Sequence, residues 1–254
     1  MLIASMTTLP GRLSDLDSVL KSLIEQTNQL DLIKIYFQGE KNQFNSSIIH
    51  NFKNVEVEFV SDYAKSKSKY YYSLKEFPND DIILVDDDLI FEEKFIESLV
   101  IGHSRQPNCV ITNLYQFPFL DVIKENCLRF TMDLYYMEYK NKWLRSQSGY
   151  GTLIPNHILD NTEILDIDKG NNFFPTSDEC WLYCNFVSNN IITYCPGIFN
   201  EKKDFIKKEI IYNNRLWSKN QYRSYINGDQ IFKYLESCNI NTNNLIYSDL
   251  DDLT

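Results

Sequence analysis

The first part of the chain alternates short apolar runs with a segment of helical periodicity. Apolar side chains dominate residues 2–6, 32–37 and 81–85, and residues 55–60 alternate between apolar and polar, so each stretch is typical of a β-strand. A period of about 3.6 residues after the first strand predicts a helix with apolar positions at Leu16, Val19, Leu20, Leu23 and Ile24. Strands that alternate with helices in this order predict a parallel sheet.

The pattern weakens further along the chain. We predict helices around residues 70–76 and 95–100, a strand at residues 109–112, and an irregular, aromatic-rich stretch over residues 113–150. Another helix begins near Ser177 with two acids in its first turn. Beyond residue 200, large apolar side chains are interleaved with basic ones, at Lys202, Lys203, Lys207, Lys208, Arg215, Lys219 and Arg223.

Three consecutive aspartates, Asp86 to Asp88, follow the apolar run of residues 81–85. Such a run is typical of a strand buried on both faces of a parallel sheet, and ligands bind at the carboxyl ends of strands in open α/β sheets. On an extended segment Asp86 and Asp88 share a face, and Asp87 points elsewhere. Hard carboxylate oxygens suit a divalent cation, so we interpret Asp86 and Asp88 as metal ligands. The alternative is an acidic loop that caps the next helix.

Composition narrows the class of protein. The chain has 254 residues, of which 43% are hydrophobic, enough for one large α/β domain with or without a C-terminal appendage. The formal net charge of -10 makes nucleic acid an unfavourable partner. The six cysteines form no CxxC pair, and we find neither signal-peptide features nor a membrane-spanning apolar run, so we expect a cytoplasmic protein with reduced cysteines.

Four stretches, in this order along the chain, resemble small bacterial nucleotide-sugar glycosyltransferases of the GT-A fold, which carry an Asp-x-Asp motif at a strand end. They are residues 5–12, residues 67–70, residues 81–88, and residues 149–151 taken with 175–182. The resemblance implies a Rossmann-like α/β fold, with a mixed, mostly parallel sheet flanked by helices, over residues 1–200. Residues 201–254 then form a basic-aromatic C-terminal segment, which we expect to be helical.

The resemblance also implies a donor site. Thr8 and Arg12 lie at the nucleotide base and phosphates, Lys69 contacts the nucleotide, and Asp86 and Asp88 serve ribose and metal, which is Mn²⁺ or Mg²⁺ in this fold. Asp87 is available to a ribose hydroxyl or a backbone amide. Many such enzymes complete the metal shell with a C-terminal histidine, and this sequence has only His50, His103 and His157, so the third ligand stays open.

An inverting transferase needs a base for the acceptor hydroxyl. The resemblance places Asp178 in this role, ahead of an aromatic helix that we expect to raise the pKa of its carboxyl group. Glu179 competes for the role, and both are also explained as first-turn acids favoured by the helix dipole. For the acceptor or sugar pocket we predict Tyr150, Gly151, Glu179 and Trp181, although a tight turn explains Gly149 and Gly151 equally well.

The implied function is metal-dependent transfer of a sugar, of hexosyltransferase type, from a UDP-sugar to a saccharide, lipid-linked or other glycoconjugate acceptor in surface polysaccharide or lipooligosaccharide synthesis. A metal-dependent nucleotidyltransferase and a non-catalytic sugar- or nucleotide-binding module remain as alternatives. The basic C-terminal segment has two interpretations. It forms packing helices with solvated lysines, or it rests on anionic lipid and holds the protein peripherally at the inner face of the membrane.

Overall fold

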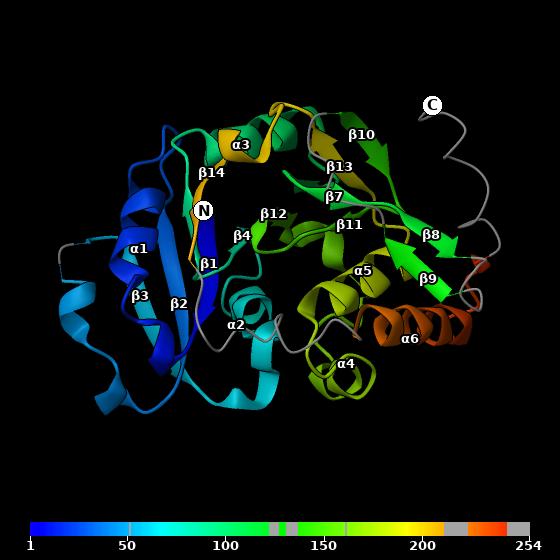
Figure 1. Cartoon of the computed structure of the whole chain (residues 1–254), viewed down its shortest axis with the longest axis horizontal. Helices are drawn as coiled ribbons and strands as arrows, with labels where there is room; N and C mark the ends of the chain where they lie inside the picture. Colours follow the sequence, from blue (N-terminus) through cyan, green and yellow to red (C-terminus); the bar gives the residue numbers. More distant parts are fainter. Residues whose placement is uncertain (51, 122–126, 131–136, 161, 211–222, 243–254) are drawn as a thin grey trace.

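A computed structural model describes residues 1–254 with the exception of residues 51, 122–126, 131–136, 161, 211–222 and 243–254. Its centre is an eight-stranded sheet in the order β10-β13-β6-β12-β4-β1-β2-β3 (Figure 1). The strands are β1 (Leu2–Thr8), β2 (Leu32–Gln38), β3 (Val55–Val60), β4 (Asp81–Val85), β6 (Val110–Thr112), β10 (Glu138–Asn141), β12 (Tyr150–Pro155) and β13 (Thr193–Pro196).

The sheet is mixed and mostly parallel, as predicted. Strands β1 to β4 run parallel, β12 is antiparallel to both of its neighbours, and β13 is parallel to β6. Only β10, at the edge, and β12 therefore run against the rest of this sheet. The parallel strands β1 and β4 end side by side, which brings Thr8 and the three aspartates to one edge.

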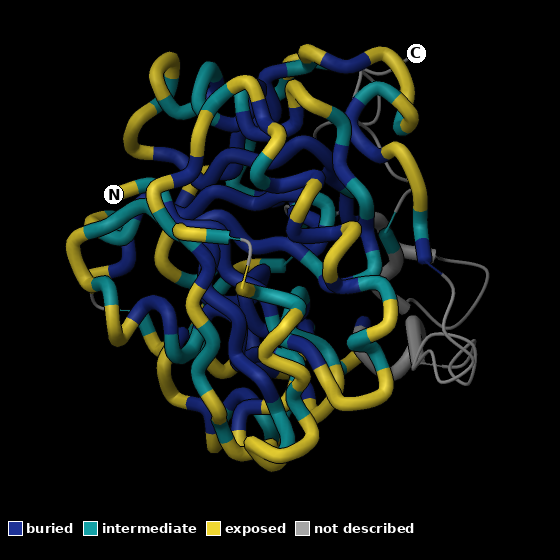
Figure 2. Tube along the Cα trace, turned by 90° about the vertical axis from the view of Figure 1, so that its left-hand side faces the viewer, coloured by how far each residue is buried: buried dark blue, intermediate teal, exposed yellow. Residues whose placement is uncertain are grey.

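Helices cover both faces of the sheet, as the apolar periodicity requires. One face packs against α1 (Leu16–Ile24), α3 (Phe95–Arg105) and the small sheet of β5 (Leu89–Phe91) with β14 (Ile206–Glu209). The other packs against α2 (Ser68–Glu76), α4 (Ile167–Phe173), α5 (Asp178–Ser188) and α6 (Arg223–Ser237), below the sheet in Figure 1. Along β4, Ile83 and Val85 belong to the first core and Ile82 and Leu84 to the second, so this strand is buried on both faces. Figure 2 shows the strands as a buried band inside an exposed rim.

Residues 113–150 are more ordered than we predicted. The described part contains β7 (Tyr115–Gln116) paired with β11 (Arg145–Ser146), the edge strand β10, and β8 (Pro118–Asp121) paired with β9 (Cys127–Phe130). The prediction of an irregular stretch was wrong because strands of two to four residues show no measurable alternation.

The described parts of the C-terminal segment, β14 and α6, pack onto the rest of the molecule. Strand β14 pairs with β5, and the Ile210 amide donates to the Asp88 carbonyl at 2.7 Å. Helix α6 confirms the expected C-terminal helix. Its Tyr234 ring packs edge-on against the Trp181 ring of α5, with 5.2 Å between the ring centres. Among the lysines expected at a lipid surface, Lys202 pairs with Glu209 at 2.6 Å and Lys203 with Glu201 at 2.7 Å. Arg215 and Lys219 lie outside the described residues. Within the described residues, no helix combines the length and apolar character that crossing a bilayer requires.

Candidate functional site

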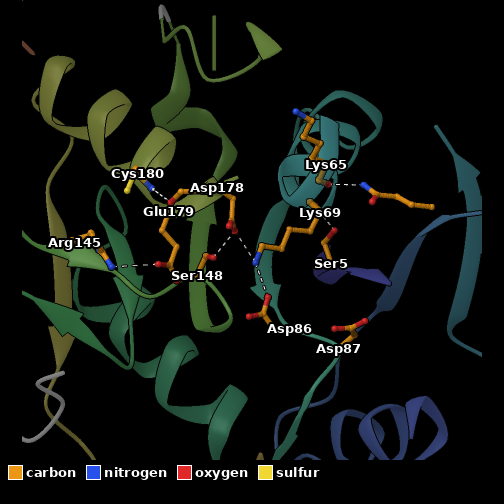
Figure 3. A network of polar contacts seen from close by, with 12 residues as sticks. Ser5, Lys65, Lys69, Asp86, Asp87, Arg145, Ser148, Asp178, Glu179 and Cys180 are labelled. Carbon is orange, nitrogen blue, oxygen red and sulfur yellow. Dashed lines mark hydrogen bonds and ion pairs between the residues drawn. The ribbon is translucent and has the colours of Figure 1, made fainter. Parts of the chain in front are cut away.

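Lys69 is the central cation of the candidate site (Figure 3). Its Nζ lies 2.7 Å from Asp86 Oδ1 and 2.8 Å from Asp178 Oδ2, and the residue is 4% exposed. Burial acts to lower the pKa of Lys69, but the two carboxylates outweigh burial and raise the pKa. Hydroxyl groups of Ser5 and Ser73 donate to its carbonyl oxygen and hold the backbone. A single buried ammonium group therefore joins the end of β4 to the start of α5.

Asp87 points into the protein, but from a turn that follows β4 and not from the extended segment that we expected. It is 1% exposed, and Arg12 Nη1 lies 2.6 Å from its Oδ1 and 3.9 Å from Asp88 Oδ2. Burial raises the pKa of Asp87, and the Arg12 guanidinium and the Thr8 hydroxyl offset part of the rise. Thr8, Arg12 and Asp87 therefore form a second charged cluster beside the first. The structure thus brings together the residues predicted for the donor site.

Gly149 permits the close approach of Asp86. A Cβ atom at this position would lie 1.9 Å from Asp86 Oδ2, and the Asp86 amide donates to the Gly149 carbonyl at 3.3 Å. Gly151 has a different explanation, because its φ is 93° and a Cβ atom would lie 2.6 Å from the Phe95 ring. Gly151 is buried within β12, and backbone geometry and packing account for it.

Asp178 and Glu179 occupy the first turn of α5 but have different surroundings. The Ser148 hydroxyl donates to Asp178 Oδ2 at 2.8 Å. Burial acts to raise the pKa of Asp178, but the Lys69 ammonium and the Ser148 hydroxyl outweigh burial and lower the pKa. Our expectation of a raised pKa at Asp178 was wrong because sequence did not reveal these partners. Burial instead raises the pKa of Glu179 to about 7, against the opposing charge of Arg145, whose Nη2 lies 3.4 Å away.

Trp181 and Tyr150, both predicted for the sugar pocket, have different surroundings. Trp181 is fully buried and its indole donates to the Ile164 carbonyl at 3.1 Å, so the sugar-pocket prediction was wrong because no surface of the ring is accessible. Tyr150 is half-buried, and its hydroxyl donates to Glu209 at 2.9 Å and accepts from Lys202 at 3.0 Å. Tyr150 is the β12 residue paired with Val85, and therefore lies beside the aspartates.

The two candidate metal ligands, Asp86 and Asp88, have side chains 41% and 17% exposed. Across the described ranges, no three His, Cys, Asp or Glu side chains gather as a metal site. Mg²⁺ commonly takes one or two protein carboxylates and completes its shell with water and substrate phosphates. The donor set present fits a cation held jointly with a phosphorylated substrate.

Comparisons with known proteins bear on the fold. No family model matches the sequence, and no curated protein matches it. The structure is similar to residues 1–349 of TarS from S. aureus in complex with UDP, with a TM-score of 0.53 and 10% identity over 81% of this chain and 59% of that chain. A second structure of TarS 1–349 gives a TM-score of 0.52 and 11% identity over the same shares of the two chains. The fold is that of GT-A proteins.

These similarities concern fold alone, and the chain spans 59% of the length of the TarS 1–349 chains. The 4-diphosphocytidyl-2C-methyl-D-erythritol synthase of Anaerococcus prevotii reaches a TM-score of 0.49 at 12% identity, over 72% of this chain and 82% of that one. That score is too low to support the nucleotidyltransferase alternative.

Three polar residues of the site were missed from the sequence: Lys67, Arg145 and Ser148. Nothing local in the sequence distinguishes Lys67 or Arg145 from surface lysines and arginines. Their partners, the Phe174 carbonyl and the Glu179 carboxylate, lie far along the chain. Ser148 directly precedes the Gly149–Gly151 turn that drew attention in the sequence. A glycine in a turn often marks a close contact of the backbone with a functional group. Gly149 was therefore a signal that its neighbour Ser148 could lie in the site.

Proposed function

We propose that the protein transfers a sugar from a UDP-sugar to an acceptor hydroxyl. The observation that carries the proposal is the pair of contacts of Lys69, which places the aspartates after β4 next to the acids that open α5. A sugar transferase needs these two groups on either side of the reacting carbon: one to hold the nucleotide diphosphate and one to take the acceptor proton. The fold supports the proposal, since a structure of similar fold was solved with UDP.

At the donor end, Thr8, Arg12, Lys69, Asp86 and Asp87 would contact the nucleotide-sugar. Asp86 and Asp88 would hold Mn²⁺ or Mg²⁺, which neutralises the charge that develops on the departing diphosphate. Arg12 and Lys69 add two cations at the same corner. Both are paired with carboxylates that a bound diphosphate would compete with.

Two carboxylates can act as the base, and their surroundings favour Glu179 over Asp178. A base is most effective when its pKa lies near the working pH, and burial brings the pKa of Glu179 to about 7. Asp178 is held by Lys69 and Ser148 and has a lowered pKa, so it is the weaker proton acceptor. In the inverting reaction, the acceptor oxygen bonds to the anomeric carbon as the bond to the diphosphate oxygen breaks. The acceptor proton passes to the base, and UDP leaves with the electron pair.

The test uses the full chain with a panel of UDP-sugars, Mn²⁺ and saccharide acceptors. Release of UDP that depends on the acceptor, together with a new glycoside seen by mass spectrometry, supports the proposal. Pyrophosphate release points to a nucleotidyltransferase. Tight UDP-sugar binding without turnover points to a binding module. Products attached to surface polysaccharide or lipooligosaccharide fragments would support the expected pathway class.

A further inference from the structure

A cluster of polar side chains, Gln116, Arg145 and Gln147, lies beyond Glu179, on the side away from Asp86. Strands β7 and β11 pair so that Arg145 lies opposite Gln116. The backbone N–H of Gln147 extends this pairing by donating to the Leu114 carbonyl at 3.1 Å. This small sheet faces the first turn of α5 through the contact of Arg145 with Glu179. Our sequence prediction gave it no role, because its strands have two residues each.

The side chains of this cluster form a joined hydrogen-bond network. In the amide orientation that satisfies both of its ends, Gln147 donates to Glu179 Oε1 at 3.0 Å and accepts from Arg145 Nη2 at 3.0 Å. The Cζ atom of Arg145 also lies 4.2 Å from the centre of the Phe130 ring, a cation–π contact that helps to hold the guanidinium in place. The side chains of Arg145 and Glu179 are 16% and 24% exposed, so the network is supported from behind and still reaches the surface.

The chemistry of the network matches a hydroxyl group. A hydroxyl both donates and accepts, and here Glu179 accepts, Arg145 donates, and the amides of Gln116 and Gln147 can do both. The cluster holds one cation, Arg145, and one acid, Glu179, which contact each other. A phosphate or carboxylate would meet Glu179 and Asp178, and an amine would meet Arg145, so charged groups of either sign are disfavoured.

The order of the site places the cluster at the acceptor end. In Figure 3 Arg145 contacts Glu179 at one end of the site, and a separate series of contacts runs from Ser148 to Asp178 and through Lys69 to Asp86. Asp178 and Glu179 are neighbours in α5 and connect the two sets. Resting on the proposed function, in which the diphosphate lies at the aspartate end, the opposite end is left for the acceptor. We propose that Gln116, Arg145, Gln147 and Glu179 form the acceptor subsite, and that it takes a neutral, polyhydroxylated acceptor such as a saccharide or sugar alcohol.

Two variants, Gln147→Ala and Gln116→Ala, test the subsite. Gln106→Ala, at the end of α3, is the matched control. The probes are methyl glycosides of glucose, galactose and N-acetylglucosamine, and their 6-phosphates. We expect transfer to neutral probes in preference to phosphorylated ones. Gln147→Ala should raise the acceptor KM about 5-fold, the usual effect of one lost hydrogen bond between neutral groups, with UDP affinity unchanged.

Saturation-transfer NMR with the same probes separates the two proposals. The wild type could bind the saccharides, with weaker binding by Gln147→Ala, and still release no UDP. This result would support the subsite and contradict the transferase. Equal losses of UDP affinity and of acceptor binding in both variants would overturn the subsite, as would preferential use of the phosphorylated probes. Because Gln147 is 8% exposed and Gln116 half-buried, the second variant keeps the test informative if the first does not fold.

Discussion

The three aspartates after β4 have three different surroundings. Asp86 is the most exposed and contacts Lys69, whereas Asp87 is buried against Arg12. Asp88 lies between these extremes, and its carbonyl accepts from the Ile210 amide of the C-terminal segment. The adjacent carboxylates are tolerated because cations lie beside them: Lys69 pairs with Asp86, and Arg12 lies 2.6 Å from Asp87 and 3.9 Å from Asp88. A bound cation would add to this compensation at Asp88.

The role of Asp88 is tested by Asp88→Asn, with the exposed Asp17→Asn of α1 as the control. We expect Asp88→Asn to lower the rate of UDP release by on the order of 100-fold or more, since a metal supplies several kcal/mol at the transition state. The melting temperature should change little, because Asp88 is not buried. Initial rates with Mn²⁺ and with EDTA measure the effect. Full activity of the wild type in EDTA would contradict the metal assignment.

The choice between the two acids is tested by Glu179→Gln and Asp178→Asn. We expect Glu179→Gln to lower kcat by roughly 10²–10⁴-fold, the range for a lost general base. The wild-type kcat should rise with pH through about 7, because Glu179 accepts a proton only once it has lost its own. This rise should be absent from the residual activity of Glu179→Gln. An inactive Asp178→Asn beside an active Glu179→Gln would instead assign the base to Asp178.

The approach of Asp86 to the backbone is tested by Gly149→Ala. The added Cβ would lie 1.9 Å from Asp86 Oδ2 and must push this carboxylate away. Because the displaced atoms are the partly exposed end of a side chain, we expect stability to change little. Misplacement by about 1 Å can cost on the order of 100-fold in rate, so activity should fall. Gly11→Ala is the control, since its Cβ meets nothing within 4 Å, and equal activities of the two variants would show that the position of Asp86 is unimportant.

At the scale of elements, the segment before α2 clamps two parts of the site. Lys65 lies at a kink with φ of 51°, and Gln38 of β2 donates to its carbonyl at 2.5 Å. Two residues on, the fully buried Lys67 donates to the Phe174 carbonyl at 2.6 Å and to Asn171 at 3.3 Å. Phe174 lies in the turn from α4 to α5. The segment therefore anchors the turn that leads to Asp178.

Lys67 makes stability depend on pH in a defined direction. Burial lowers the pKa of Lys67 to about 8, below the value of about 10.4 for an unfolded lysine. Between these values the unfolded chain binds more protons, so stability rises with pH, by up to on the order of 3 kcal/mol. Lys67→Met should abolish this rise relative to wild type, and the exposed Lys65→Met should keep it. Urea unfolding at pH 7.5 and 10 measures the effect, and parallel curves for wild type and Lys67→Met would refute it.

The elements differ in how far the sequence predicts them. The continuous apolar run of β4 and the helical period of α1 are clear in the sequence, and their burial confirms the interpretation. Strands β7, β11 and β14 show none, because each is two to four residues long and depends on a partner far along the chain. Tertiary pairing, which no local pattern reports, decides such elements. The polar groups that they carry, such as Arg145, were missed for the same reason.

At the scale of the molecule, the site is created by strand order. Parallel strands β1 and β4 place Arg12 and the aspartates at one edge, and this part follows from sequence through the rule for α/β sheets. The insertion of the antiparallel β12 next to β4 brings Gly149 to Asp86. The sequence did not predict this neighbour, since an antiparallel strand breaks the repeating unit. The burial of the site residues and their ion pairs, which determine the pKa shifts, can be predicted only when this strand order is known.

The charge of the whole molecule also bears on the membrane interpretation of the C-terminal segment. Anionic lipid offers about 1 kcal/mol for each lysine near its surface. Among the described lysines of this segment, Lys202 and Lys203 already pair with glutamates, and Lys207, Lys208 and Lys233 are exposed. These three offer about 3 kcal/mol, a small gain for a protein whose net charge of -10 the same surface repels. We therefore expect no co-sedimentation with vesicles rich in anionic lipid at physiological salt.

The vesicle test includes a Lys207→Gln, Lys208→Gln double variant and neutral vesicles as controls. Wild type and the double variant should remain in the supernatant alike, at physiological salt and at 0.5 M salt. The expectation would be contradicted if the wild type bound the vesicles, salt weakened this binding, and the double variant did not bind. These two exposed side chains can affect vesicle binding only if their surface faces the lipid. In that case β14, which leads into Ile210 beside Asp88, would bring a lipid-borne acceptor close to the aspartates.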